Sequence, residues 1–228
     1  MAKTSFTVKK ISIIAMLCAL AYVTMYFLRI PGIGGFLTYD PKDVVITIGG
    51  FMLGPLAAAV ISVIVSFFEM ITVSTTGPYG FVMNVLATFA FACTASVIYR
   101  KMHNMKGAVI GLVSGVVAMT VVMILANFFI TPLYLISRNA FASSAEARKY
   151  VSGQIVVLLL PFNALKAALN ATITVIFYKP VVTALRKANL LPPSSSGKAG
   201  KFRLPTIITA LVILIVCIIL IFVMKNAA

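Results

Sequence analysis

The sequence predicts an all-α integral membrane protein, with a body of six helices and one further C-terminal transmembrane helix. Hydrophobic residues make up 61% of the 228 residues and charged residues only 10%, and the mean hydropathy is +1.10. A soluble globular domain carries about 25% charged residues. Most apolar segments also approach the ~20 residues that a spanning helix needs. These observations exclude a soluble domain and predict several membrane crossings.

Seven apolar segments follow one another: 11–28, 44–53, 56–73, 81–99, 108–130, 155–178 and 206–224. The first is longer than the usual 7–15-residue core of a signal peptide, and more spans follow it, so we expect it to be retained. The second is too short to span, since ten residues at ~1.5 Å each cover about half of the hydrocarbon core. Gly54 and Pro55 follow it, which predicts a broken helix that turns directly into the next one. Discontinuous helices often accompany transport sites.

The last segment follows a stretch rich in Pro, Ser, Gly and Lys. We therefore divide the chain into a body of residues 1–188, a linker of residues 189–204 and an additional transmembrane helix of residues 205–228. Thr209 and Cys217 are the polar residues of that helix between Ile207 and Val223. We expect an anchor or packing element that is dispensable for the function of the six-helix body.

A net charge of +15 could indicate nucleic-acid binding, but the positions of the charges argue against it. With the N-terminus inside, twelve Lys and Arg residues fall on the cytoplasmic side and six outside, as the positive-inside rule requires. The charges thus predict a multi-pass membrane protein with a cytoplasmic N-terminus. Attraction to anionic membrane lipid follows from the same charges.

Lys166 lies inside an otherwise uncharged segment, with Asn163 and Asn170 on the same helical face. A lysine within a span costs roughly 2.5–3.5 kcal/mol on insertion scales, so it indicates a functional site that faces protein or a cavity. The alternative is a lysine that snorkels to the outer interface and binds nothing. For each asparagine the alternative is a hydrogen bond between helices, worth about 0.6 kcal/mol on average.

The loop between the first two segments, residues 29–43, is rich in glycine and proline at its start and extended at Leu37–Tyr39. Asp40 or Asp43 can cap the next helix. A loop this apolar is better explained as a lid over a site at the outer helix ends than as a water-exposed connection. Glu69, near the end of the third segment, is expected to pair with another group or to cap.

The sequence has few residues that could form a metal site or a catalytic site. One histidine and four acidic residues are too few for a metal cage or an ordinary hydrolytic triad. The phosphate loop GxxxxGK[ST] is absent from the sequence. The three cysteines are widely spaced within apolar segments, which favours buried thiols over a disulfide. We therefore expect no enzyme activity, no metal and no resident cofactor.

The motifs Leu37-Thr38-Tyr39-Asp40-Pro41-Lys42-Asp43, Ile48 to Pro55 and Pro161-Phe162-Asn163-Ala164-Leu165-Lys166 together resemble the S-components of energy-coupling factor (ECF) transporters, and most of all the riboflavin-specific ones. The likeness covers about residues 5–188. It implies a subunit in the bacterial cell membrane that captures riboflavin outside the cell and then associates with a transmembrane T-component and two ATPases. It leaves open whether flavin mononucleotide (FMN) also binds.

Carried onto this sequence, the resemblance implies polar ligand contacts from Asn127, Asn163 and Lys166, with Leu37, Thr38 and Tyr39 closing above them. Asn84 is a further candidate for ligand contact that the resemblance does not supply. Aromatic faces for the flavin can come from Tyr39, Phe128 and Phe162, and nearby methionines can add contacts.

Ala15 and Ala19 match the alanine motif with which the family contacts its T-component. Small residues at this spacing also suit packing within one chain.

Two other functions stay open. One is an S-component for another vitamin, such as thiamine, biotin or folate. The other is an intramembrane enzyme or a non-catalytic membrane assembly subunit. The absence of hydrolase and phosphotransfer motifs argues against an enzyme.

Overall fold

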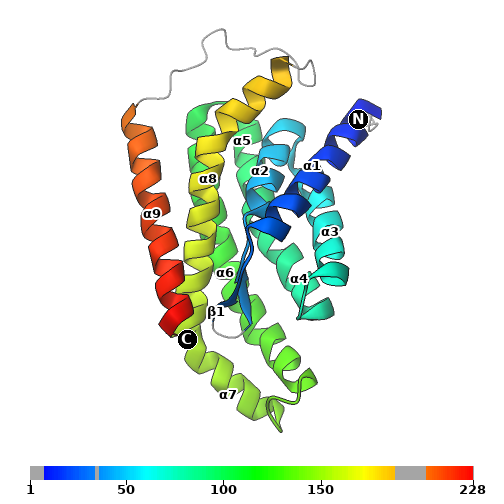
Figure 1. Ribbon diagram of the computed structural model, residues 1–228, viewed down its shortest axis with the longest axis vertical. Helices are drawn as coiled ribbons and strands as arrows, with labels where there is room; N and C mark the ends of the chain where they lie inside the picture. The colour runs from blue at the N-terminus through cyan, green and yellow to red at the C-terminus, as the bar shows by residue number, and fades with distance from the viewer. Residues whose placement is uncertain (1–7, 34–35, 188–203, 228) are drawn as a thin grey trace.

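The computed structural model describes residues 8–33, 36–187 and 204–227, which form a bundle of long helices with one small β-hairpin (Figure 1). Its elements run in the order α1 (Val8–Phe27), β1 (Ile30–Ile33), β2 (Leu37–Tyr39), α2 (Lys42–Leu53), α3 (Pro55–Thr72), α4 (Gly77–Thr88), π-helical turn η1 (Phe89–Cys93), α5 (Thr94–Met102), α6 (Met105–Ser137), α7 (Ser144–Gln154), π-helical turn η2 (Ile155–Leu159), α8 (Leu160–Lys187) and α9 (Leu204–Ala227).

Five stretches within the described residues are long and apolar enough to cross a membrane: Lys10–Phe27, Pro55–Thr72, Gly77–Met102, Met105–Ser137 and Ser144–Tyr178. Helices α4 and α5 form one crossing because η1 continues the helix between them, and η2 joins α7 to α8 in the same way. With the short α2 these make the six-helix body. The expected all-α membrane fold is confirmed.

Helix α2 is the broken element that the sequence predicts. It ends at Leu53, and Gly54 adopts φ +97°, a backbone conformation that side chains with a Cβ rarely tolerate. Pro55 then begins α3, where its missing N–H costs nothing. The prediction that Asp40 or Asp43 caps α2 is wrong. Pro41 precedes the helix, and no side chain caps it.

Helix α6 packs against η1 and α5 at backbone distance. A Cβ on Gly111 would lie 2.6 Å from the carbonyl oxygen of Ala95, and one on Gly115 would lie 2.8 Å from that of Phe91. Both distances are too short for real Cβ atoms, so glycine is needed at each position. Small residues allow this approach between membrane helices, where van der Waals packing drives association.

The loop after α1 forms an antiparallel hairpin, in which Ile30 faces Tyr39 and Ile33 faces Leu37. The extended segment expected at Leu37–Tyr39 is therefore present as β2, whereas strand β1 was not foreseen. Beyond the hairpin, polar contacts described below tie the start of α2 to the helices behind it.

Helix α9 lies along α8 in Figure 1 and also contacts β1. Cys217 and Ile221 are buried in this contact, while Val212, Ile215 and Val223 are exposed. The expected linker, residues 189–204, lies outside the described residues except for its last residue. The three cysteines, all within the described part, are free.

Candidate functional site

A cavity opens between the hairpin and the adjoining halves of α4, α6 and α8. It is lined by Arg29, Phe36, Leu37, Thr38, Glu69, Ser74, Thr75, Thr76, Tyr79, Gly80, Met83, Asn84, Ala87, Met119, Met123, Asn127, Ile130, Thr131, Tyr134, Phe162, Asn163 and Lys166. Six of the seven residues expected to bind ligand are in this wall. The seventh, Tyr39, is buried behind it.

The cavity is narrow. Its volume is about 100 Å³. That is room for several waters. A three-ring ligand therefore requires side chains in the wall to move outward.

Lys166 is buried at the wall of this cavity, with 6% of its surface exposed. Its Nζ donates to Asp40 Oδ2 at 3.2 Å and to the carbonyl oxygen of Thr38 at 3.3 Å. The snorkelling alternative does not fit this geometry, because the ammonium is held inside by a carboxylate. Lys166 thus connects α8 to the hairpin as well as facing the cavity.

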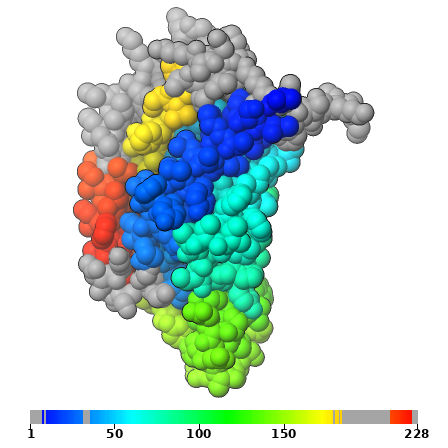
Figure 2. All heavy atoms as spheres, turned by 45° about the vertical axis from the view of Figure 1, so that its right-hand side comes forward, coloured from blue at the N-terminus to red at the C-terminus, as the bar shows by residue number. Residues whose placement is uncertain are grey.

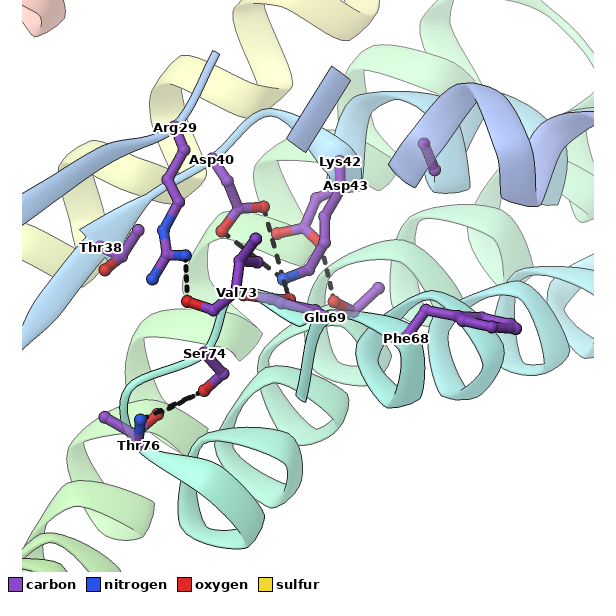
Figure 3. Close-up of polar contacts among 12 residues, drawn as sticks. Arg29, Thr38, Asp40, Lys42, Asp43, Phe68, Glu69, Val73, Ser74 and Thr76 are labelled. Atoms are coloured by element: carbon purple, nitrogen blue, oxygen red, sulfur yellow. Dashed lines mark hydrogen bonds and ion pairs between the residues drawn. The ribbon is translucent and has the colours of Figure 1, made fainter. Parts of the chain in front are cut away.

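Asp40 belongs to a larger buried ion network. Lys42 Nζ lies 3.4 Å from Asp40 Oδ1 and also pairs with Glu69 on α3 (Figure 3). The expected pairing of Glu69 is therefore present. Asp40 Oδ1 makes no hydrogen bond in the described part of the chain. Burial alone would raise the pKa of Asp40, but the charges of Lys166 and Lys42 outweigh it and lower that pKa to about 2.

Asp43 extends the network towards α4 and α8. Its Oδ1 accepts a hydrogen bond from the Thr88 hydroxyl at 2.6 Å, and its Oδ2 accepts one from Asn170 Nδ2 at 3.2 Å. Tyr39 donates its hydroxyl proton to Asn170 Oδ1 at 3.2 Å. Asn170, which the sequence places on one stripe with Lys166, therefore supports the loop and does not line the cavity.

Three of the chain's four acidic residues are gathered here with two lysines, giving a formal net charge of minus one. Charges in such a place must be paired, because an isolated buried ion is very costly. The network fastens the residues that follow the hairpin to α3, α4 and α8 at once.

The cavity amides are already engaged with their own helices. Asn163 Nδ2 donates to the Leu159 carbonyl, and Asn127 Nδ2 donates to the Met123 carbonyl, both at 2.7 Å. Asn127 Oδ1 accepts from Thr131 at 2.9 Å. These bonds fix the orientation of both amides. Asn84 on α4 also lines the cavity.

The aromatic wall differs from the expectation. Phe162 lines the cavity, but Phe128 is 37% exposed and stands outside the lining, so its assignment is wrong. Tyr79 and Tyr134, which the sequence reading did not single out, line the cavity with ring centroids 6.1 Å apart. Met83, Met119 and Met123 also line the cavity, so methionines are present where ligand contacts from them are expected.

Arg29 stands at the cavity wall, where its guanidinium donates to the Val73 carbonyl at the end of α3 at 2.6 Å (Figure 3). It thereby ties the segment before β1 to the loop that follows α3. No sequence pattern around Arg29 predicts this contact, which joins residues 44 positions apart.

Ala15 and Ala19 lie away from the cavity, on an apolar surface groove lined by residues of α1 and α3. These two helices lie side by side on the face of the molecule that Figure 2 shows. Both side chains are exposed, so they do not pack in the core of this chain. Ile14, Cys18, Tyr22 and Phe68 are among the other residues of the groove.

The comparison with known families adds to this geometry. The family described as "ECF transporter, substrate-specific component" matches residues 9–178, well over half of the chain.

The chain belongs to this family of ECF transporter S-components. It is thus a substrate-specific component of a membrane transporter, and its apolar helices make it a multi-pass membrane protein.

Similar proteins are known for this S-component. It is 30% identical over 193 residues to the "Riboflavin transporter FmnP" of Bacillus subtilis, a match that covers 80% of this chain and 98% of that protein. It is 29% identical over 181 residues to the "Riboflavin transporter RibU" of Staphylococcus aureus, covering 78% and 93%. A solved chain described under "Structure and mechanism of the S component of a bacterial ECF transporter" aligns with a TM-score of 0.62 at 27% identity, covering 78% of this chain and 98% of that one.

Proposed function

We propose that this S-component binds riboflavin in the cavity beneath the hairpin and presents it for uptake. The observation that carries the proposal is a single cavity with Asn127, Asn163 and Lys166 on its wall and β2 beside them, in a chain similar to two riboflavin transporters. The hairpin end is outside the cell if the N-terminus is cytoplasmic, as the basic residues favour.

The chemistry of the wall suits a flavin. The pyrimidine edge of the isoalloxazine ring alternates carbonyl acceptors with an N–H donor, and an asparagine amide offers the complementary pair. The ammonium of Lys166 can donate to a carbonyl or a ribityl hydroxyl. Phe162, Tyr79 and the three methionines provide apolar and polarisable surface for the ring system.

Ligand entry requires the narrow cavity to widen. The hairpin is the element to move, because β2 contributes Leu37 and Thr38 to the wall. In the described part of the chain, two hydrogen bonds join β2 to side chains of α8, at Thr38 and at Tyr39. The bond from Lys166 to the Thr38 carbonyl is one of them. A flavin oxygen that accepts from Lys166 would compete with this bond.

Delivery into the cell is proposed to need partners. A T-component would contact the groove at Ala15 and Ala19, and two ATP-binding subunits would hydrolyse ATP, since the sequence of this chain has no phosphate loop.

A titration of the purified protein tests the binding step. We expect riboflavin to bind tightly with loss of flavin fluorescence, and thiamine, biotin and folate not to compete. Adding FMN to the same series determines whether a phosphate is accepted at the cavity mouth. Failure to bind riboflavin together with binding of another vitamin would replace the proposed ligand. Failure to bind any of them would favour an assembly subunit.

A further inference from the structure

Helix α9 packs against the elements that close the cavity. Cys217 and Ile221 are 5% and 1% exposed and belong to one apolar cluster with Tyr39, Phe162 and Leu169. Leu37 and Ile30 of the hairpin, and Leu214 and Met224 of α9, pack around this cluster. The cluster thus joins three elements: the hairpin, α8 and α9.

Two members of this packing also face the ligand site. Phe162, a member of the cluster, and Leu37, which packs against it, both line the cavity. Tyr39 connects the cluster to the ion network through its bond to Asn170. A displacement of α9 therefore changes the support of the cavity wall directly.

The side chains of α9 are divided accordingly. Leu214, Cys217, Ile221 and Met224 recur at spacings of three and four residues, which places them on one helical face. Ile215 and Ile219 between them are each 55% exposed. A helix that served only as an anchor in lipid would not need a buried stripe against the hairpin.

The helix is also an addition to the family pattern. The family match ends at residue 178, and the match to the Bacillus subtilis transporter covers 98% of that protein but only 80% of this chain. The relatives therefore offer no account of what α9 does.

We propose that α9 is a brace for the hairpin, in which Cys217 and Ile221 are positioning residues that keep the cavity closed over bound ligand. This rests on riboflavin being the ligand. It revises the expectation that the terminal helix is dispensable for capture. The brace slows ligand release, because the hairpin must separate from α9 and α8, or carry α9 with it, before the cavity widens.

The first experiment uses matched isoleucines on the full-length chain. Ile221→Ala removes packing against the hairpin–α9 cluster, and Ile219→Ala makes the same chemical change on the exposed face two residues away. We expect bound radiolabelled riboflavin, chased with excess unlabelled riboflavin, to leave the first variant about three- to tenfold faster, since truncation of a packed side chain leaves a cavity. The second should release it at the native rate. Equal release from both variants would overturn the proposal.

The second experiment keeps both isoleucines. In a Cys18→Ala/Cys93→Ala background, Cys217 is the single thiol, and a maleimide reports how often its buried site opens. We expect saturating riboflavin to slow this labelling at least about fivefold, because ligand holds the hairpin against α9. Labelling at the same rate with and without riboflavin would overturn the brace, even where Ile221→Ala fails to fold. A chain that binds no riboflavin would instead refute the proposed function.

Discussion

Replacing Lys166 with methionine tests the two tasks that the structure gives this side chain, a proposed ligand contact and an ion pair with Asp40. Loss of a charged donor to the flavin costs about 1.5–3 kcal/mol, or roughly ten- to a hundredfold in affinity. Removing one partner of a buried ion pair costs about 3–5 kcal/mol of stability. Since Asp40 keeps Lys42, we expect the lower end of that range or less.

The double variant Lys166→Met/Asp40→Asn separates the tasks. It returns the formal charge of the network to minus one, so stability should recover relative to Lys166→Met. Binding should stay weak if Lys166 contacts the ligand itself. Recovery of binding in the double variant would show that Lys166 acts through Asp40 and the hairpin.

Riboflavin titration and thermal unfolding in detergent measure both effects. Lys149→Met is the matched control, because Lys149 is an exposed lysine on α7. It should change neither affinity nor melting temperature. Native affinity together with a native melting temperature in Lys166→Met would contradict both roles, since removal of a buried lysine with two hydrogen-bond partners should change at least one of these quantities.

Three further predictions concern other parts of the molecule. Ala15→Leu/Ala19→Leu should prevent co-purification with the T-component while riboflavin affinity stays native, because the added side chains fill an exposed groove remote from the cavity; loss of binding with intact assembly would contradict the groove as an interface. Asn170→Ala removes the hydrogen bonds to Asp43 Oδ2 and from the Tyr39 hydroxyl, so it should lower the melting temperature and weaken binding less than Asn163→Ala does; the reverse order in a titration would place Asn170 in contact with ligand. A tag after Ala228 should be cleaved by protease added to intact cells, and protection of the tag would reverse the orientation expected for the last helix.

The sequence was most informative where structure is set locally. The length of each apolar segment predicted the spans, and Gly54-Pro55 marked the break after α2 because positive φ and a missing N–H act on the chain where they occur. Helix α7 was missed since its polar composition gives no membrane signal. The π-helical turns at Phe89–Cys93 and Ile155–Leu159 have no simple sequence pattern.

The candidate site was predictable only in part. Asn163 and Lys166 could be recognised as polar residues in an apolar helix. The ion-pair partner of Lys166, Asp40, is 126 positions away and could not be predicted from the local sequence. Asp40 and Asp43 looked like helix caps because acids before a helix usually are. Lys42, Lys166 and the three acidic residues Asp40, Asp43 and Glu69 lie within or beside apolar segments, where charges have to be paired. The number of such charges was the one sequence signal for the ion network.

The backbone contact of Gly111 and Gly115 with α5 and η1 has a consequence for how the protein moves. Helices packed this closely have little room to slide or rotate past each other, so we expect α6, α5 and η1, together with α4 that continues into η1, to move as one unit. Met119 and Met123 of α6 and Met83 and Asn84 of α4 keep fixed positions on it. We therefore expect the cavity to widen by movement of the hairpin and the helices behind it.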